Sequence, residues 1–365
     1  MPTVQDARGR DLTVEGRPRR IVSLVPSLTE SVAALTGADR LVGITKFCTQ
    51  PEDDVPAIQK VGGTKDPDLD AIVALAPELV LANQEENRAE DIEALEAAGL
   101  TVFVGYPRTV PDSVEELRTI AKLIGGGLVR SLLSPIEDEI ARQESLREQR
   151  PTVRVFCPIW RAPYMAVGGD TYAGDMIRLA GGTNVFENHA RGNRYPQVQL
   201  SEIAAADPEV ILLPDEPYRF GRRHRDEMLA LRSITAARER RIHLVDGRWL
   251  TWHGKRATEG LAGLEALLDQ ARPTWEAPAR PVLEKPKQAS KKTAGKTGAS
   301  KRTAGKTGAS KKTAGRPTKT PVRSAAKKAG PSKKATPAPK RAPKTETALP
   351  PGLKLRVRSQ EVVEE

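Results

Sequence analysis

Cysteine and histidine are scarce in this 365-residue chain, which limits the metal and redox chemistry that it could carry. The two cysteines, Cys48 and Cys157, are far apart and form no C-x-x-C pair, so neither a disulfide framework nor a thiolate zinc site is expected. The four histidines form no H-E-x-x-H pattern and no closely spaced pair, which argues against a receptor for bare metal ions.

Signatures of catalysis are also missing. There is no G-x-S-x-G nucleophile motif, and no glycine-rich phosphate loop follows the first predicted strand. The sequence Ala-Gly-Lys-Thr at 294–297 and 304–307 matches the end of a P-loop, but Ser290 and Ser300 stand where its leading glycine belongs. We therefore predict a protein that is not an enzyme and that has no intrinsic cofactor.

Long apolar runs are absent as well. No segment approaches the roughly eighteen uninterrupted apolar residues of a membrane span, and residues 1–10 contain neither the apolar stretch nor the cleavage site of a secretory leader. These observations predict a cytoplasmic location and no membrane span, with a periplasmic or cell-surface location as the alternative if translation begins upstream. A monomer is expected.

Acidic residues are missing from one part of the chain. Residues 285–345 hold 20 Lys and Arg and no Asp or Glu, whereas the rest has 38 basic and 47 acidic residues, so the net charge of +11 describes neither part. Residues 290–315 repeat a ten-residue unit, Ser-Lys-Lys-Thr-Ala-Gly-Lys-Thr-Gly-Ala, with no aromatic side chain and almost no apolar bulk. This composition predicts a disordered tail over residues 278–365.

The basic tail predicts a partner with many negative charges. Its Lys-Lys-Ala-Gly-Pro-Ser-Lys-Lys segment resembles lysine-rich histone H1 tails, and cations without base-reading side chains indicate phosphate contacts of little sequence preference. Non-specific nucleic acid binding through residues 285–345 is favoured, anionic lipid is the competing partner, and a tail that only aids solubility is the simplest alternative. The predicted nucleic-acid contacts are Lys291, Lys292, Lys296, Lys301, Arg302, Lys306, Lys311 and Lys312.

Strand and helix patterns alternate before the tail. Residues 21–25 read Ile-Val-Ser-Leu-Val, which suits a strand buried on both faces, and Ser27 with Glu30 has the spacing of a capping box for a helix over 28–35. Further strands are predicted at 41–45, 78–82 and 101–104. The alternation indicates βαβ units and an α/β fold with parallel sheets.

A set of residues that recurs at a fixed offset, which we call the echo, indicates that the helix–strand unit is used twice. Six residues recur at an offset of 131 positions: Leu69, Ile72, Pro77, Glu78, Val80 and Leu81 return as Leu200, Ile203, Pro208, Glu209, Ile211 and Leu212. A duplicated architecture predicts two lobes with a cleft between them. We place the N-terminal lobe at 1–124, an interlobe helix at 125–150 and the C-terminal lobe at 151–277, and we expect the glycines at 125–127 and Pro135 to break or kink the connection.

The stretch Arg-Ile-Val-Ser-Leu-Val-Pro-Ser-Leu-Thr-Glu at 20–30 resembles the opening of class III substrate-binding proteins, the helical-backbone receptors that hand cobalamin, haem or ferric siderophores to ABC importers. The resemblance covers about residues 3–275. It implies two Rossmann-like lobes joined by a helical segment, a metal chelate in the interlobe cleft and an ABC importer permease as partner. Members normally act outside the inner membrane, which conflicts with the predicted cytoplasmic location.

Aromatic residues make up only 4% of the chain, yet five of them fall in loop-like positions of the predicted second lobe: Trp160, Tyr164, Tyr195, Trp249 and Trp252. Large flat ligands bind against aromatic faces, although loop aromatics also anchor loops to the body of a protein. In the resemblance, the segment around the first two of these and residues 83–88 of the first lobe lie at the cleft. Family members dock their importer through one acidic residue on each lobe, which points to Glu85, Glu86 or Glu90 and to Glu187 or Glu202.

The late segment Trp252-His253-Gly254 offers a further candidate. His253 can cap an iron or cobalt centre through an imidazole nitrogen, with Trp252 beside the ring and Arg256 meeting carboxylates or phosphate. A hydrogen-bonded turn histidine explains the same residues equally well. The predicted ligand-binding residues are Ser27, Asn83, Glu85, Glu86, Asn87, Trp160, Tyr164, Tyr195, Trp252, His253 and Arg256, with His253 as the axial metal ligand.

The favoured function is therefore non-catalytic binding of a metal chelate, a corrinoid before haem or a ferric siderophore, by an importer-type substrate-binding protein or an intracellular relative. One alternative is a nucleoid-associated protein that acts through its basic tail, with the receptor-like body in a sensory or structural role. A weaker alternative is an enzyme that acts on a corrinoid.

Overall fold

The computed structural model describes residues 3–189 and 194–276, which belong to one compact unit of the chain. The tail predicted over 278–365, with the nucleic-acid contacts assigned to it, lies outside the described residues. Within the described ranges, no helix is both long enough and apolar enough to cross a membrane.

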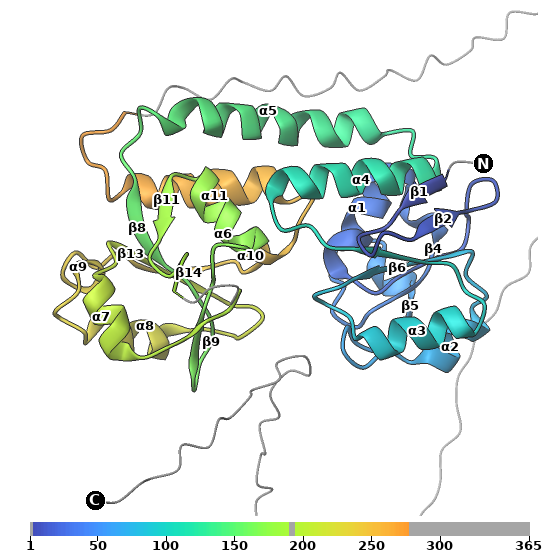
Figure 1. Ribbon diagram of the computed structural model, residues 1–365, viewed down its shortest axis with the longest axis horizontal. Helices are drawn as coiled ribbons and strands as arrows, with labels where there is room; N and C mark the ends of the chain where they lie inside the picture. Colours follow the sequence, from blue (N-terminus) through green and yellow to red (C-terminus); the bar gives the residue numbers. More distant parts are fainter. Residues whose placement is uncertain (1–2, 190–193, 277–365) are drawn as a thin grey trace, which may run out of the picture. The chain divides into compact units, whose positions relative to one another are not determined.

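The first lobe is built on a five-stranded parallel sheet in the order β5-β4-β3-β6-β7 (Figure 1). Its strands are β3 (Ile21–Ser23), β4 (Leu41–Ile44), β5 (Gln59–Lys60), β6 (Leu79–Asn83) and β7 (Val102–Gly105). The other elements of the lobe are the hairpin β1 (Thr3–Gln5) and β2 (Asp11–Thr13) and the helices α1 (Pro26–Thr36), α2 (Leu69–Ala74) and α3 (Ala89–Ala97). All residues of β3, β6 and β7 are buried, as apolar runs predict for a sheet covered on both faces.

The second lobe holds a four-stranded parallel sheet, β11-β8-β13-β14, and a small antiparallel sheet, β12-β10-β9. The parallel strands are β8 (Val153–Phe156), β11 (Gly182–Asn184), β13 (Val210–Pro214) and β14 (Ile242–Val245), and the antiparallel ones are β9 (Pro158–Trp160), β10 (Tyr164–Ala166) and β12 (Gln197–Val198). The helices are α6 (Tyr172–Leu179), α7 (Leu200–Ala206), α8 (Arg222–Leu229), α9 (Thr235–Arg238), α10 (Arg248–Thr251) and α11 (Ala257–Asp269). The predicted α/β fold with parallel sheets is confirmed.

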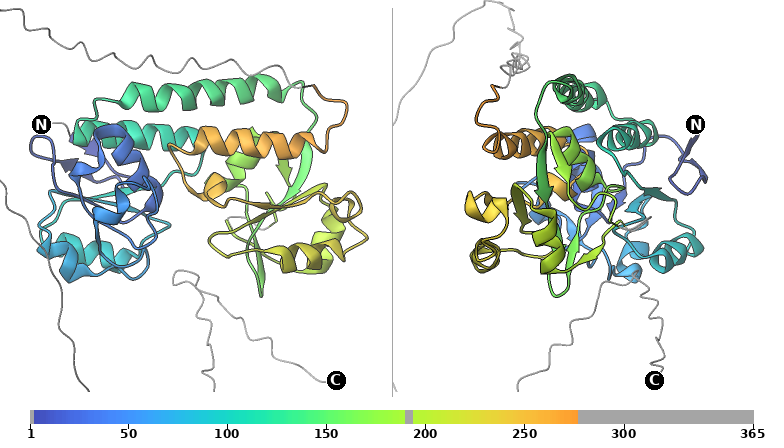
Figure 2. Two further views of the ribbon diagram at one scale, coloured as in Figure 1. Left: turned by 180° about the vertical axis from the view of Figure 1, so that it is seen from behind. Right: turned by 60° about the vertical axis from the view of Figure 1, so that its left-hand side comes forward.

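Two helices connect the lobes, α4 (Val110–Ile124) and α5 (Val129–Arg147). Gly125 ends α4 in the left-handed conformation, with φ of 70°, so the glycines break the connection as predicted. Pro135 lies inside α5 and does not break that helix. Figures 1 and 2 show α5 running along α4 and α11, and both pairs are in contact.

The echo at an offset of 131 residues corresponds to real elements. It makes α2 and β6 of the first lobe equivalent to α7 and β13 of the second. The bounds of the two strands differ by the same 131 positions. The loops that follow these strands are therefore equivalent positions of the two lobes. In parallel α/β sheets, the carboxyl ends of the strands are where ligands bind.

Apolar packing is continuous from one lobe to the other. A single buried cluster contains Ile21 of the first sheet, Leu117 of α4 and Leu264 of α11, each fully buried. The interlobe helices therefore share one hydrophobic core with both sheets, which stabilises a fixed arrangement of the elements.

Candidate interlobe binding site

The loop after β6 is held in place by two buried asparagines. The Asn83 side-chain carbonyl accepts the backbone N–H groups of Glu85 at 2.8 Å and Glu86 at 3.2 Å. Asn87 accepts the N–H of Asn83 at 2.8 Å and donates to the carbonyl of Leu24 at 3.3 Å. Asn83 and Asn87 are each 4% exposed, so both predicted site residues shape this loop from beneath.

Glu85 joins the two lobes. Its carboxylate pairs with Arg194 of the second lobe at 3.2 Å, and Arg194 also donates to the hydroxyl of Tyr106. The Arg194 guanidinium lies 4.8 Å from the Tyr106 ring centre and 6.0 Å from that of Tyr195. Burial, together with the nearby Glu85 carboxylate, raises the pKa of Tyr195 well above its usual value, so this phenol stays neutral.

Two further carboxyl groups lie close by. Glu86 is half-buried, and burial raises its pKa while Lys65 opposes that rise. Lys65 donates to the backbone carbonyl of Glu85 at 2.7 Å, and burial lowers the pKa of its ammonium group. Glu216 of the second lobe accepts from the Thr251 hydroxyl at 2.5 Å, and its pKa is raised by burial first and then by the carboxylates of Asp215 and Glu86. We call these residues the carboxyl cluster: Lys65, Glu85, Glu86, Tyr106, Arg194, Tyr195 and Glu216.

A second, more deeply buried group surrounds His253. Its Nε2 lies 3.0 Å from the Glu116 carboxylate, and its Nδ1 lies 3.3 Å from the Ser27 hydroxyl. Burial alone would lower the pKa of His253, but the carboxylates of Glu116 first, and then of Glu86 and Glu85, outweigh it and the net shift is upward. The Glu116 carboxylate therefore favours the protonated form of this imidazole, which lies between α1 and α4 with only 6% of it exposed.

Two glycines leave room for the buried Glu116 and His253 side chains. Glu116 lies on the buried face of α4, and a Cβ atom on Gly105 would collide with its carboxylate. Gly254 has φ of +90°, and a Cβ there would lie 2.9 Å from the Ser31 hydroxyl and 3.0 Å from Leu117. Glycine at both positions lets the polar groups approach closely inside the core.

Cations that follow His253 meet an acid of the first lobe. Arg256 contacts the Glu30 carboxylate at 2.8 Å and Lys255 contacts it at 3.2 Å, while Trp252 lies 5.6 Å from the Arg256 guanidinium. We call these residues the histidine cluster: Ser27, Glu30, Glu116, Trp252, His253, Lys255 and Arg256.

The predicted capping box is wrong. Helix α1 starts at Pro26, its N-cap is Val25 and no side chain caps it. Ser27 and Glu30 are instead buried contacts to the second lobe, which local spacing alone does not reveal. The axial-ligand role of His253 stays a prediction, and its ring here faces Glu116 and Ser27. Within the part of the chain that the structure describes, no group of three His, Cys, Asp or Glu could hold a metal ion.

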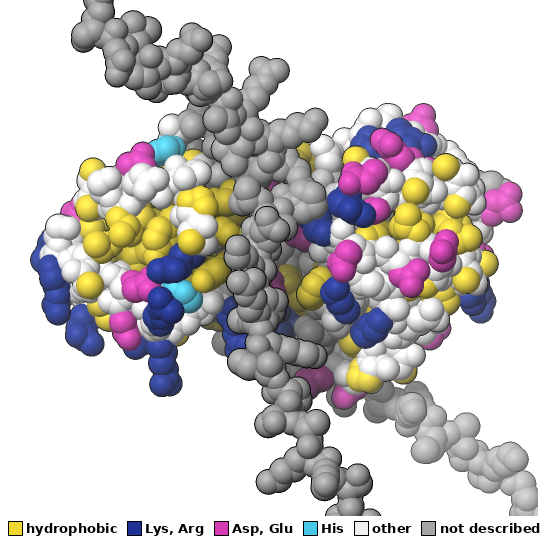
Figure 3. Space-filling model, turned by 90° about the horizontal axis from the view of Figure 1, so that it is seen from below, with side chains coloured by type: hydrophobic (Ala, Val, Ile, Leu, Met, Phe, Trp, Pro, Cys, Tyr) yellow, Lys and Arg dark blue, Asp and Glu magenta, His cyan; other side chains and the backbone are white. Residues whose placement is uncertain are grey.

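The remaining predicted aromatics lie outside both clusters. Trp160 packs edge-on against Tyr218, with ring centres 5.5 Å apart, and Tyr164 packs against a buried apolar cluster that includes Phe156 and Ile211. The loop assignment was wrong for Trp160, Tyr164 and Trp249, which lie on β9, β10 and α10. Figure 3 shows hydrophobic side chains gathered on this lobe, with Lys and Arg side chains toward its outer edge.

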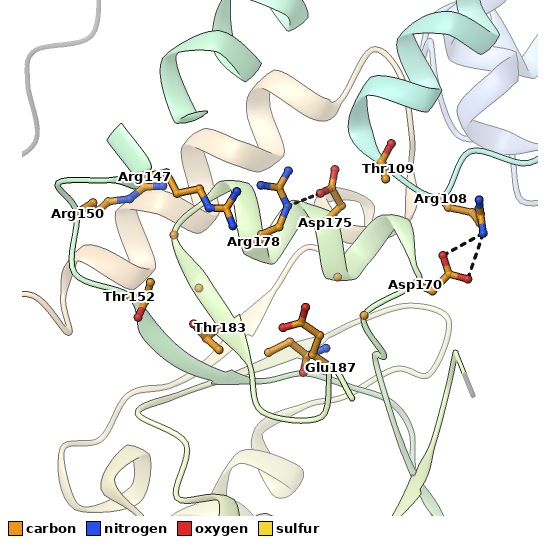
Figure 4. Close-up of a pocket in the computed structure, with 15 residues that line it drawn as sticks. Arg108, Thr109, Arg147, Arg150, Thr152, Asp170, Asp175, Arg178, Thr183 and Glu187 are labelled. Carbon is orange, nitrogen blue, oxygen red and sulfur yellow. Dashed lines mark hydrogen bonds and ion pairs between the residues drawn. The ribbon is translucent and has the colours of Figure 1, made fainter. Parts of the chain in front are cut away.

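A pocket of about 260 Å³ lies between α5, α6 and the start of α4 (Figure 4). Arginines line it, but they already have acidic partners: Arg108 pairs with Asp170 at 3.2 Å and Arg178 with Asp175 at 2.7 Å. Of its residues, the sequence singled out only Glu187, as one of two candidate importer-docking acids of the second lobe. Its paired charges make it a weaker candidate for a ligand than the carboxyl cluster.

Sequence reasoning missed several residues of both clusters. Glu116 carried a usable signal, because an acid on the apolar stripe with Leu117 and Ile120 must be buried. Glu216 carried another, since it stands 131 positions after Glu85. Arg194, Tyr106 and Lys65 carried none, because only the tertiary fold brings them to Glu85.

Comparison with known proteins agrees with this architecture. The family profile of periplasmic binding proteins matches residues 21–248. An uncharacterized ABC transporter substrate-binding lipoprotein of Bacillus subtilis, YvrC, is 30% identical over 280 residues, covering 72% of this chain and 83% of that protein. A vitamin B12-binding protein of Vibrio parahaemolyticus is 26% identical over 204 residues, covering 55% and 72%.

Solved structures share the fold. The periplasmic vitamin B12 binding protein BtuF of Vibrio cholerae superposes with a TM-score of 0.61 at 18% identity, covering 70% of this chain and 98% of that one. The periplasmic haem-binding protein RhuT from Roseiflexus gives a TM-score of 0.60 at 25% identity, covering 70% and 99%.

These comparisons correct the predicted cytoplasmic location. The Bacillus relative is a lipoprotein and BtuF is periplasmic, so the similar proteins act outside the cytoplasm. The prediction rested on the lack of a long apolar run and of leader features in residues 1–10, and neither observation says anything about a segment upstream of the given sequence.

Proposed function

This chain belongs to the periplasmic binding protein family, and we propose that it binds a metal chelate between its two lobes, a corrinoid before haem or a ferric siderophore. Its role is to present that chelate to an ABC importer, in keeping with its similarity to the ABC transporter substrate-binding lipoprotein of Bacillus subtilis. The protein acts by binding and release, and no bond of the ligand is made or broken.

The observation that carries the proposal is the meeting of side chains from both lobes in the carboxyl cluster. Glu85 and Tyr106 come from the loops after β6 and β7, and Arg194 and Tyr195 come from the segment before β12. Polar groups and aromatic rings at the carboxyl ends of parallel strands are the usual lining of a site for a large, flat ligand.

The choice of a corrinoid rests on the relatives. Besides the Vibrio proteins, a cobalamin-binding protein of Halobacterium salinarum is 30% identical over 220 residues, covering 58% of each chain. Haem is the next candidate because RhuT binds haem.

A thermal-shift experiment on the full chain tests this function. Cyanocobalamin, haemin and a ferric siderophore are each added to the purified protein. A ligand held at 100 times its Kd stabilises the folded state by about 2.7 kcal/mol, which raises Tm by several degrees. We expect the largest shift with the corrinoid.

Two arginine variants give this experiment a matched control. The Arg194→Ala variant should lose the shift because it removes the group that joins the lobes at the site. The Arg118→Ala variant removes an exposed arginine of α4 and should keep it. Absence of a shift with every chelate would reject the proposed function.

A further inference from the structure

The arginines near the two clusters are already committed to acids. Arg194 pairs with Glu85 at 3.2 Å, and Arg256 pairs with Glu30 at 2.8 Å. Arg248, next to Trp252 at 5.8 Å, donates to Asp246 at 2.8 Å. An arginine that recognises an anionic ligand must offer free N–H groups to it. These three would have to give up an ion pair first.

The acids of the carboxyl cluster, unlike these arginines, are not all paired with an opposite charge. Glu85 and Glu216 occupy equivalent positions, two residues beyond the ends of β6 and β13, so each lobe supplies one acid at the same place. Glu86 adds a third. Among residues 3–189 and 194–276, the structure gives an ion-pair partner to Glu85 but none to Glu86 or Glu216, and Thr251 is the hydrogen-bond donor to Glu216.

Burial makes these two carboxyl groups costly. Both are half-buried, and burial raises the pKa of each; Asp215 and Glu86 raise that of Glu216 further, and Glu85 raises that of Glu86. A half-buried carboxylate gains most from a ligand that brings a positive charge or an N–H donor, and it opposes a ligand that brings another negative charge.

The candidate chelates differ in that respect. A cobalt(III) corrinoid with neutral axial ligands is cationic, and amide groups around its ring donate hydrogen bonds. Haem carries carboxylates at its edge, and ferric catecholates are anionic. An acceptor-rich site therefore distinguishes these classes by charge.

We propose that the carboxyl cluster selects its chelate by charge, with Glu86 and Glu216 favouring cationic corrinoids over anionic chelates. This inference rests on the proposed function and names the ligand class for the same site. Glu86 and Glu216 are its specificity-determining residues, one from each lobe.

Two forms of one ligand test the selection in the full chain. Cobinamide in its cationic aquo form and in its neutral dicyano form shares a macrocycle and differs in charge. Binding is measured by quenching of tryptophan fluorescence, with haemin as the anionic comparison. The wild-type protein should bind the aquo form about tenfold more tightly than the dicyano form, as expected for one charge contact at a partly exposed site.

Isosteric variants assign the effect to the two residues. Glu86→Gln and Glu216→Gln should each reduce the preference for the aquo form severalfold, and the double variant should bring the ratio close to one. Glu93→Gln, an exposed acid on α3, makes the same change in net charge and should leave the ratio unchanged. Melting temperatures confirm that each variant is folded.

The outcomes separate this inference from the function on which it rests. If no chelate binds the wild-type protein, the proposed function and this inference both fail. If chelates bind but the two forms of cobinamide bind equally, or haemin binds more tightly than either, only the charge selection is overturned. It is also overturned if Glu93→Gln lowers the ratio as much as Glu86→Gln.

Discussion

The two interlobe clusters satisfy their charges in different ways. In the histidine cluster each acid meets a cation, Glu116 with His253 at 3.0 Å and Glu30 with Arg256 at 2.8 Å, and both acidic side chains are no more than 5% exposed. In the carboxyl cluster Glu86 and Glu216 are half-buried, and no described cation pairs with them. In the described residues, each acid of the first cluster has a cation within ion-pair distance, whereas two acids of the second cluster have none.

The difference shows that buried polar groups can serve two purposes in a two-lobed protein. A buried ion pair adds little net stability, but removing one partner is costly because the other charge is left buried. Such pairs therefore specify one arrangement of the lobes. Groups with unmet hydrogen-bonding capacity can instead give specificity to the bound state.

Removing Glu116 should cause the largest loss of stability among the changes to the two clusters. The Glu116→Ala variant leaves the His253 imidazole buried without its carboxylate, and we expect a loss of about 2–3 kcal/mol in the free energy of unfolding, near the lower end for a broken buried pair because the imidazole can lose its proton. Urea unfolding at pH 6 measures it. The neighbouring Glu115→Ala, at an exposed pair with Arg118, should cost less than about 1 kcal/mol. Equal losses would show that the histidine cluster does not fix the lobes.

The second-largest loss of stability is expected at Gly254. Its φ of +90° and the short contacts of a Cβ with Ser31 and Leu117 predict that Gly254→Ala destabilises the protein by about 2 kcal/mol. Gly9→Ala is the matched control, since φ there is +76° but no atom lies within 4 Å of the added Cβ. Thermal unfolding of both variants separates the crowding from the backbone strain, and a loss no larger at Gly254 would mean that the contacts relax freely.

The pH dependence of stability should reflect the same cluster. The folded-state pKa of His253 is raised, so its contribution is fully present below its unfolded pKa near 6.5 and is lost as pH rises through the folded value. The wild-type protein should therefore exceed His253→Gln in unfolding free energy most clearly at pH 6, by about 1 kcal/mol, and less at higher pH. The raised pKa of Glu86 also makes the protein less stable as pH rises, but this effect begins at a lower pH, above about 4.5. A constant difference between pH 6 and 9 would contradict the ion pair.

The sequence allowed the architecture to be predicted, but only part of the site. The apolar runs of the strands and the echo at an offset of 131 residues report local periodicity, so the parallel sheets and the equivalence of β6 and β13 were accessible. Residues 83–88 and 252–256 were also predicted as site residues, and the structure places members of both ranges in the two clusters. Their partners were not, because Arg194 reaches Glu85 and Glu116 reaches His253 only through the packing of the lobes. The capping-box error at Ser27 and Glu30 has the same origin, since local spacing cannot distinguish a cap from a buried interlobe contact.

The smallest expected change in stability lies in the carboxyl cluster. Glu86→Gln removes a half-buried charge for which the described residues offer no ion pair, so the free energy of unfolding at pH 7 should stay the same or rise by less than about 1 kcal/mol. Glu93→Gln on the exposed face of α3 sets the baseline for losing one negative charge. A loss of more than about 1 kcal/mol in Glu86→Gln, measured by urea unfolding without ligand, would mean that this carboxylate is stabilised within the protein. The carboxyl cluster would then resemble the histidine cluster, and Glu86 would have no binding capacity in reserve for a chelate.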